Sequence, residues 1–290
     1  MTWRLLLVLA LAAMPSCRKA PSGGGASSQP AGPRIITFSP ALASIVFEMG
    51  LGDHVVGVSA YSNLPQGQSR PVVGDRQNVN TERIASLRPD LILVQQNPKD
   101  FDLLRRMDGR IAIEHFAIEN LDALGAAVER IGKLAGKEAL GVEKRRQFQD
   151  KLSDIRRRVA GLPAPRVLFL TAVDPPSVAG GDSFLHEMIE LAGGEDVTAK
   201  YERWTQINVE RMLAARPEVV VCQSEPGRED QTRAFLAGLN DMPAAQSGRI
   251  FVVSDQRWTV PSMFLADLAG TLAEMIHPAL AAPATKGAHP

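Results

Sequence analysis

This sequence carries the stretch NTERIASLRPDLILV at residues 80–94 and a near copy, NVERMLAARPEVVVC, at residues 208–222. Five of the fifteen positions are identical at a constant offset of 128 residues, and Asp90 is exchanged for the similar Glu218. An internal repeat constrains the fold more strongly than any single element, and a solenoid would need more copies than two. The repeat therefore predicts two similar lobes.

Short apolar runs surround both copies and alternate with segments of helical periodicity. Around the first copy they are RIITFS, HVVGVS and IAIEHF, and around the second they are RVLFLT and RIFVVS. Continuous apolar runs of this length are typical of buried parallel strands. Their alternation with helices predicts an α/β fold, with a mostly parallel, Rossmann-like sheet at the centre of each lobe.

A long charged segment interrupts this alternation between the two copies. It reads KEALGVEKRRQFQDKLSDIRRRV and contains no proline. Twenty-odd helical residues extend about 35 Å. We expect an N-terminal lobe at residues 34–136, a connecting helix at 137–160, a C-terminal lobe at 161–278 and a disordered tail at 279–290. Ligands of such sheets bind beyond the carboxyl ends of the strands, which places the predicted site in a cleft between the lobes.

The N-terminus has the pattern of an export signal. Residues 1–17, MTWRLLLVLALAAMPSC, combine Arg4 with a nine-residue apolar run that is too short to span a bilayer. Cys17 follows Ser16 in an arrangement that resembles a bacterial lipobox, which predicts a lipoprotein signal peptide and lipidation of Cys17. Residues 18–33 are rich in Gly, Ser and Pro and predict a disordered tether. Secretion without a lipid anchor is the alternative.

Composition and motifs argue against several classes of function. The formal net charge is zero, so no basic surface indicates nucleic-acid binding. The sequence has no phosphate-binding glycine loop and no nucleophile elbow, and its five histidines lack metal-ligand spacing. Cys222 lies in an apolar run and is expected to be a buried small hydrophobe. We therefore expect neither an enzyme nor a metal or cofactor site.

Three segments together resemble a known family: RIITFSPALASIVFEMGLGDHVVGVSAYSNLP, VVGDRQNVNTERIASLRPDLILV and WTQINVERMLAARPEVVV. They are similar to the periplasmic solute-binding lipoproteins of the helical-backbone class, which bind cobalamin, ferric siderophores and haem. The resemblance covers residues 34–278 and is specific for the class, not for the ligand. It implies a monomer, tethered at the periplasmic face of a bacterial membrane, that delivers its ligand to an ABC permease dimer with its ATPase.

The resemblance also implies two carboxylates that dock on the permease, one from each lobe. Glu82 and Glu210 match these positions at the repeat offset. Each is expected in the first turn of a helix, where the macrodipole favours a carboxylate. The alternative is that both residues only stabilise the helix starts.

Five residues on loops that follow strands are candidates for ligand contact. They are Tyr61, Arg76, Trp204, Arg257 and Trp258. Arg76 and Trp204 are equivalent in the repeat, and each precedes its docking glutamate by six residues. An aromatic face suits a large apolar ligand, whereas a guanidinium suits carboxylate, amide or catecholate oxygens.

The ligand class remains open between metal chelates. The tyrosine loop and the Trp204 loop resemble those of cobalamin binders, and Arg76 is more typical of ferric siderophore binders. Tyr61 could be an iron ligand in a haem binder. We expect cobalamin or a related corrinoid, with a ferric siderophore and then haem as alternatives. An enzyme on a two-lobed α/β scaffold is the rival from another class, but a metallocluster would need several cysteines, and Cys222 alone cannot supply them.

Overall fold

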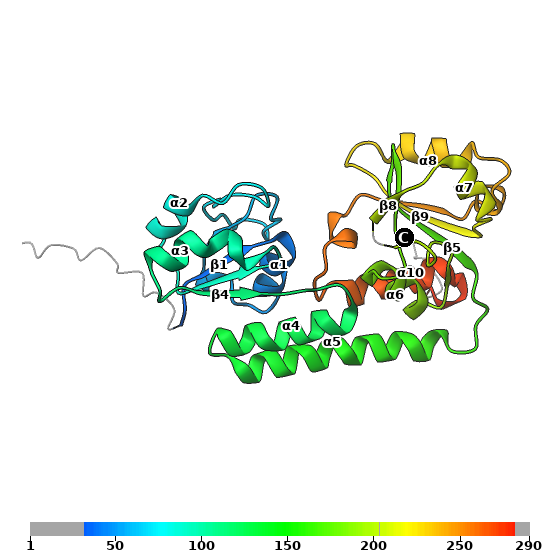
Figure 1. Ribbon diagram of the computed structural model, residues 1–290. Coiled ribbons are helices and arrows are strands. Elements are labelled where there is room, and N and C mark those ends of the chain that lie inside the picture. The colour runs from blue at the N-terminus through cyan, green and yellow to red at the C-terminus, as the bar shows by residue number, and fades with distance from the viewer. Residues whose placement is uncertain (1–31, 203, 282–290) are drawn as a thin grey trace, which may run out of the picture. The chain divides into compact units, whose positions relative to one another are not determined.

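The structure is a computed structural model that describes residues 32–202 and 204–281 (Figure 1). The predicted signal peptide with its lipidated Cys17, and nearly all of the predicted tether and tail, lie outside these ranges. Within them, no helix combines the length and the apolar character that crossing a bilayer requires.

The N-terminal lobe is built on a parallel four-stranded sheet. Its strands are β1 (Ile35–Phe38), β2 (Val55–Val58), β3 (Leu91–Val94) and β4 (Ala112–His115), in the order β2-β1-β3-β4. Strands β1 and β3 are buried along their whole length, as the continuous apolar runs predict. All four strands predicted for this lobe are therefore present.

Helices connect these strands. They are α1 (Pro40–Glu48), α2 (Thr81–Ser86), α3 (Asp102–Met107) and α4 (Leu121–Leu134), with 3-10 turns at Gly52–His54 and Pro98–Phe101. Ser39 caps α1, because its hydroxyl accepts a hydrogen bond from the backbone N–H of Leu42 at 3.3 Å. Pro40 occupies the first position of α1, where its missing N–H costs nothing. Strand β1 thus turns sharply into α1 at one edge of the sheet.

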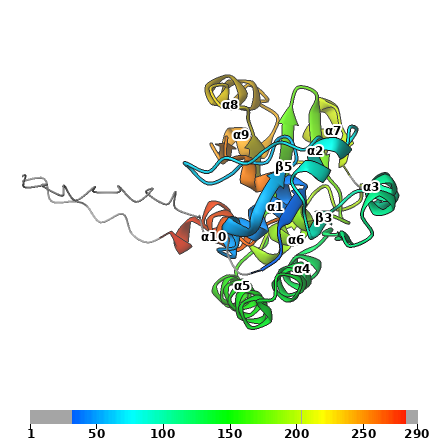
Figure 2. The same ribbon diagram turned by 90° about the vertical axis from the view of Figure 1, so that its left-hand side faces the viewer.

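Helix α5 (Glu138–Val159) is the predicted connecting helix. It packs side by side with α4 and also contacts α6 and α10 of the C-terminal lobe (Figures 1 and 2). Its buried residues Phe148, Leu152 and Ile155 belong to the largest core cluster, which includes side chains from both sheets. The two lobes therefore share one hydrophobic core along α4 and α5.

The C-terminal lobe has a separate, six-stranded sheet. Its strands are β5 (Arg166–Val173), β6 (Pro176–Ala179), β7 (Glu195–Asp196), β8 (Trp204–Gln206), β9 (Val219–Gln223) and β10 (Ile250–Val253). The order is β10-β9-β5-β6-β8, and the short β7 also pairs with β5. Strands β6 and β8 run antiparallel to their neighbours and extend a parallel core. This pair was not expected from the sequence.

The helices of this lobe are α6 (Phe184–Leu191), α7 (Val209–Ala214), α8 (Glu229–Ala237), α9 (Pro243–Gln246) and α10 (Leu265–Ile276). Two 3-10 turns, at Gln256–Thr259 and Pro278–Leu280, complete it. The predicted fold class, two α/β lobes joined by one long helix, is confirmed.

The duplicated stretches have the same local structure in both lobes. Asn80 and Asn208 cap α2 and α7 by accepting hydrogen bonds from backbone N–H groups at 2.9 and 3.0 Å. Arg88 and Arg216 end the two copies with left-handed backbones, φ 46° and 45°. These shared details show that the repeat is a structural one.

Candidate functional site

Three adjoining cavities lie at the carboxyl ends of the strands. We call them the N-lobe pocket, about 580 Å³, the interlobe pocket, about 820 Å³, and the side pocket, about 700 Å³. Pro40 lines all three, Tyr61 lines the first two, and Asn63 and Gln256 line the last two. The cavities therefore form one continuous cleft, located where the general rule for α/β sheets places ligands.

The N-lobe pocket is formed by the loops that follow β1, β2 and β3. Its lining residues are Phe38, Ser39, Pro40, Ser59, Ala60, Tyr61, Asp75, Arg76, Gln77, Gln95 and Gln96. Most of these side chains carry hydroxyl or carboxamide groups. The pocket therefore offers many hydrogen bonds and few charges.

The interlobe pocket has walls from both lobes. Pro40, Tyr61 and Asn63 come from the N-terminal lobe, and segments 171–174, 223–226 and 259–260 from the other. The Asn63 side-chain amide donates to the Gln256 carbonyl oxygen at 2.7 Å and joins the lobes across the cleft. A molecule bound in this pocket would contact both lobes.

Tyr61 lies on the wall shared by two of the pockets. Its side chain is 87% exposed, and its backbone has φ 63°, a left-handed conformation that is rare for an aromatic residue. Strained backbone of this kind clusters at ligand sites. The structure therefore places Tyr61 where the sequence analysis expected it.

The two arginines among the candidates differ in how their charges are used. Arg76 lines the N-lobe pocket, is exposed, and has no hydrogen-bond or ion-pair partner among residues 32–202 and 204–281. Arg257 lines the side pocket, where its guanidinium pairs with Asp255 at 2.6 Å and stacks on the Phe264 ring at 3.6 Å. Hydrogen bonding to Arg257 lowers the pKa of Asp255. The charge of Arg257 is thus largely compensated within the protein, whereas that of Arg76 is available.

The two tryptophans lie elsewhere than expected. Trp258 is only 2% exposed and packs against Phe169, with ring centroids 5.8 Å apart. A buried ring presents no surface to a ligand, so the placement of Trp258 contradicts the expected contact role. Trp204 is 53% exposed and packs near Phe184, but it lies outside the lining of the three pockets. The structure does not bring Trp204 and Arg76 together in one pocket.

Glu82 and Glu210 occupy equivalent surface positions. Each lies in the first turn of its helix, α2 or α7, and each is exposed. In the part of the chain that the structure describes, neither has an ion-pair partner. Glu82 also lines a shallow depression beside the exposed Val72 and Leu103.

The side pocket contains a carboxylate that the sequence analysis did not single out. Glu48, the last residue of α1, faces the turn that precedes α10 in the other lobe. Burial raises the pKa of Glu48, and hydrogen bonding around Ser262 and Phe264 offsets only part of this effect. Its Oε2 atom is buried without a hydrogen-bond partner in the described ranges.

Two glutamines of the cleft were also missed. Gln95 follows β3 and lines the N-lobe pocket, and Gln223 ends β9 and lines the interlobe pocket. They are 128 residues apart, so they extend the sequence repeat by one more identical position. That extension was the available signal, because it places the same polar residue at the carboxyl end of a central strand in each lobe.

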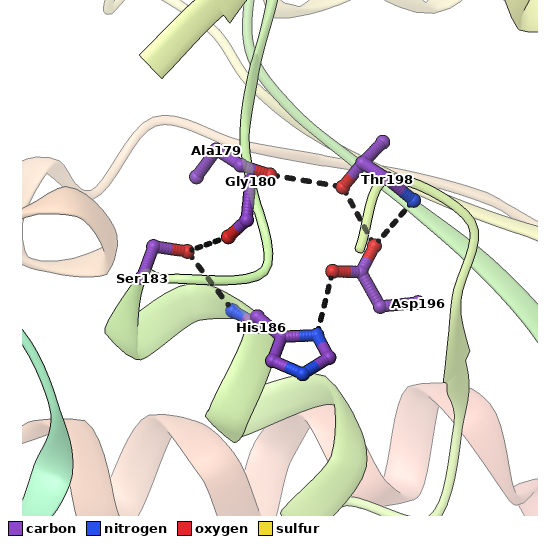
Figure 3. A network of polar contacts seen from close by, with 6 residues as sticks. All are labelled: Ala179, Gly180, Ser183, His186, Asp196 and Thr198. Carbon is purple, nitrogen blue, oxygen red and sulfur yellow. Dashed lines mark hydrogen bonds and ion pairs between the residues drawn. The ribbon is translucent and has the colours of Figure 1, made fainter. Parts of the chain in front are cut away.

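A Ser, His and Asp combination elsewhere in the C-terminal lobe does not form a catalytic triad. The ring of His186 donates to the buried Asp196 at 3.0 Å, but Ser183 contacts the backbone N–H of His186, not its ring (Figure 3). The Ser183 hydroxyl donates to the carbonyl of Gly180 at 2.6 Å. This network fixes the start of α6. Burial raises the pKa of the Cys222 thiol to about 12, so this thiol is also unreactive at neutral pH.

Comparisons with known proteins agree with the architecture. The vitamin B12-binding protein of Yersinia pseudotuberculosis serotype O:3 is 28% identical over 207 residues, 70% of this chain and 73% of that protein. The periplasmic vitamin B12 binding protein of Vibrio cholerae superimposes with a TM-score of 0.74 at 23% identity, covering 87% of this chain and 99% of that one. The periplasmic heme-binding protein of Roseiflexus sp. RS-1 gives 0.72 at 25% identity, covering 85% and 98%.

The sequence profile of one family covers most of the chain. It matches residues 35–256, which include β1, both copies of the repeat and α5, and it ends in the turn that lines the cleft. The chain belongs to the periplasmic binding protein family.

Proposed function

We propose that this protein captures a corrinoid, cobalamin or a close relative, in its cleft and delivers it to an ABC importer. One structural observation carries the proposal: the interlobe pocket has walls from both lobes and opens into two further cavities. Single ligand pockets of about 300–1,000 Å³ accommodate drug-sized molecules. Three adjoining pockets of 580–820 Å³ suit a larger ligand.

The relatives favour a corrinoid within this size class. Several curated relatives at 28% identity are vitamin B12-binding proteins. In our proposal, Tyr61 packs on the ligand where two pockets meet, and Arg76 donates to it from the N-lobe pocket. Arg257 borders the side pocket and Trp204 would reach a ligand only at the rim.

Delivery would use the two exposed glutamates. Glu82 and Glu210 present one unpaired carboxylate on each lobe, and a pair of separated charges steers docking and fixes its register. We propose that basic pockets on a permease dimer receive them. Lipidation at Cys17 would hold the protein at the periplasmic face of the membrane within reach of that permease.

A second candidate ligand is an iron chelate, haem or a ferric siderophore. The exposed phenol of Tyr61 favours it, because a phenolate is a known axial ligand of haem iron. The unpaired guanidinium of Arg76 would suit an anionic ligand. Some structural neighbours are heme-binding proteins.

Isothermal titration of the purified protein separates these candidates. Cyanocobalamin, haemin and a ferric tris-catecholate are titrated in parallel at the same ionic strength. We expect one-to-one binding of cyanocobalamin and weaker or no binding of the other two. Binding of haemin or of the ferric chelate without binding of cyanocobalamin would transfer the function to the second candidate.

A further inference from the structure

Gln95 and Gln223 are a matched pair of carboxamides at equivalent positions in the two lobes. Each stands at the carboxyl end of a buried strand next to β1 or β5, at the centre of its sheet. Each lines a different chamber of the cleft, and the two chambers meet at Pro40 and Tyr61. A ligand spanning these chambers would meet one glutamine from each lobe.

Both side chains keep hydrogen-bonding capacity that the protein does not use. Gln223 donates to the Asp255 carbonyl at 3.4 Å, while its Oε1 atom is buried and has no partner within the described ranges. Gln95 accepts a hydrogen bond from the Ser39 hydroxyl, which leaves its amide N–H groups without a partner among the same residues. One glutamine therefore offers an acceptor and the other offers donors. An unpaired buried acceptor is costly, which favours a ligand that supplies an N–H group.

The charge balance of the cleft points the same way. The three pockets are lined by five carboxylates, Glu48, Asp75, Asp174, Glu225 and Asp255, and by three guanidiniums, Arg76, Arg228 and Arg257. Arg228 pairs with Glu225 and Arg257 with Asp255. A polyanionic chelate would therefore meet excess negative charge, and Arg76 alone could compensate it.

We propose that Gln95 and Gln223 are specificity-determining residues that select a neutral, carboxamide-bearing ligand and reject anionic chelates. A primary amide both donates and accepts, so it can satisfy the Gln223 oxygen and the Gln95 amide. A carboxylate or catecholate offers acceptors only and would place oxygen against oxygen at Gln223. This inference rests on the proposed function, because the corrin periphery carries such amides.

The test uses Gln95→Met and Gln223→Met, which keep side-chain length and remove the amide. Gln149→Met, on the exposed surface of α5 and outside the pockets, is the matched control. Affinities are measured for cyanocobalamin and for its monocarboxylic acids, in which one peripheral amide is a carboxylate. We expect about tenfold weaker cyanocobalamin binding in each cleft variant and no change in the control. We also expect weaker binding of at least one monocarboxylic acid by the wild type.

Unfolding midpoints separate recognition from a structural role. Removing an unpaired buried acceptor should leave the midpoint of Gln223→Met unchanged or higher, while its affinity falls. Wild-type binding of cyanocobalamin with unchanged affinity in both cleft variants would overturn this inference and leave the proposed function intact. Tighter wild-type binding of haemin or a ferric tris-catecholate than of cyanocobalamin would overturn both.

Discussion

Tyr61 combines features that a merely structural residue would not need. Its ring is almost fully exposed, and its backbone adopts a left-handed conformation. Strain of this kind costs on the order of 1–3 kcal/mol. The fold thus holds an aromatic side chain at the wall between the N-lobe and interlobe pockets, where a flat ligand could pack on it.

Substitution of Tyr61 distinguishes packing from metal ligation. We expect Tyr61→Ala to weaken cyanocobalamin binding by about 2 kcal/mol, roughly thirtyfold, because an aromatic contact is lost. Tyr61→Phe should retain most of the affinity. Leu103→Ala, another exposed apolar residue outside the cleft pockets, is the control. Titration calorimetry provides the comparison, and a Phe variant as weak as the Ala variant would favour a role for the phenol oxygen.

Glu48 makes stability depend on pH in a defined direction. Burial raises the pKa of Glu48 above its ordinary value of 4.5, so the folded state binds this proton more tightly than the unfolded state. The resulting penalty is absent below pH 4.5 and grows as the pH rises through the raised pKa. We expect Glu48→Gln to raise the unfolding midpoint at pH 7.5 and to leave it unchanged near pH 4. Glu119→Gln, an exposed control, should show no such difference. An equal effect of Glu48→Gln at both pH values would contradict this explanation.

Individual side chains marked the limit of what the sequence could predict. Trp258 and Tyr61 both follow strands on loops, yet one ring is buried and the other is exposed. The difference arises because Trp258 lies in the 3-10 turn Gln256–Thr259, which directs its ring onto Phe169. The sequence contains no local signal for that direction.

Helices α4 and α5 approach each other closely through two glycines. A Cβ atom on Gly132 would lie 2.6 Å from the Cα of Gly141 and 3.0 Å from the carbonyl oxygen of Lys137. Such distances leave no room for a methyl group without moving the backbone. The contact fixes the helix pair that carries both lobes.

Gly132→Ala should therefore destabilise the protein although alanine is the better helix former. We expect a loss of about 1–3 kcal/mol, because overpacking forces the helices apart. Gly270→Ala in α10 is the matched control: no atom lies within 4 Å of its added Cβ, so a gain of up to about 1 kcal/mol is expected. Urea denaturation measures both changes. Equal shifts in the two variants would show that the α4–α5 contact does not constrain the fold.

The strands and helices were more predictable than the side chains. Parallel strands such as β3 and β9 are continuous apolar runs, and α5 is long and uninterrupted, so their patterns are clear. Strands β6 and β8 escaped prediction because one begins at Pro176 and the other is the three-residue stretch Trp204–Gln206. Neither has the apolar alternation that marks a strand.

For the molecule as a whole, the duplication matters because two lobes present two equivalent surfaces. Glu82 and Glu210 occupy matching helix starts, as the offset of 128 residues predicts. The cleft lies at the carboxyl ends of the strands, away from α4 and α5. Ligand binding and permease docking can therefore be separated by mutation.

The double substitution Glu82→Lys with Glu210→Lys tests that separation. We expect it to abolish ligand uptake by cells, because both docking charges are reversed, while the affinity of the purified protein stays within twofold. Glu119→Lys, which reverses one exposed charge elsewhere, serves as the control. Unchanged uptake in the double variant would rule out the docking role.

Hydrogen exchange with and without cyanocobalamin tests most directly whether both lobes hold one ligand between them. Slowed amide exchange is expected in segment 59–64 of the N-terminal lobe and, in the same sample, in segments 171–174 and 223–228 of the C-terminal lobe. Protection of one lobe only, or of surfaces outside the three pockets, would contradict a shared cleft.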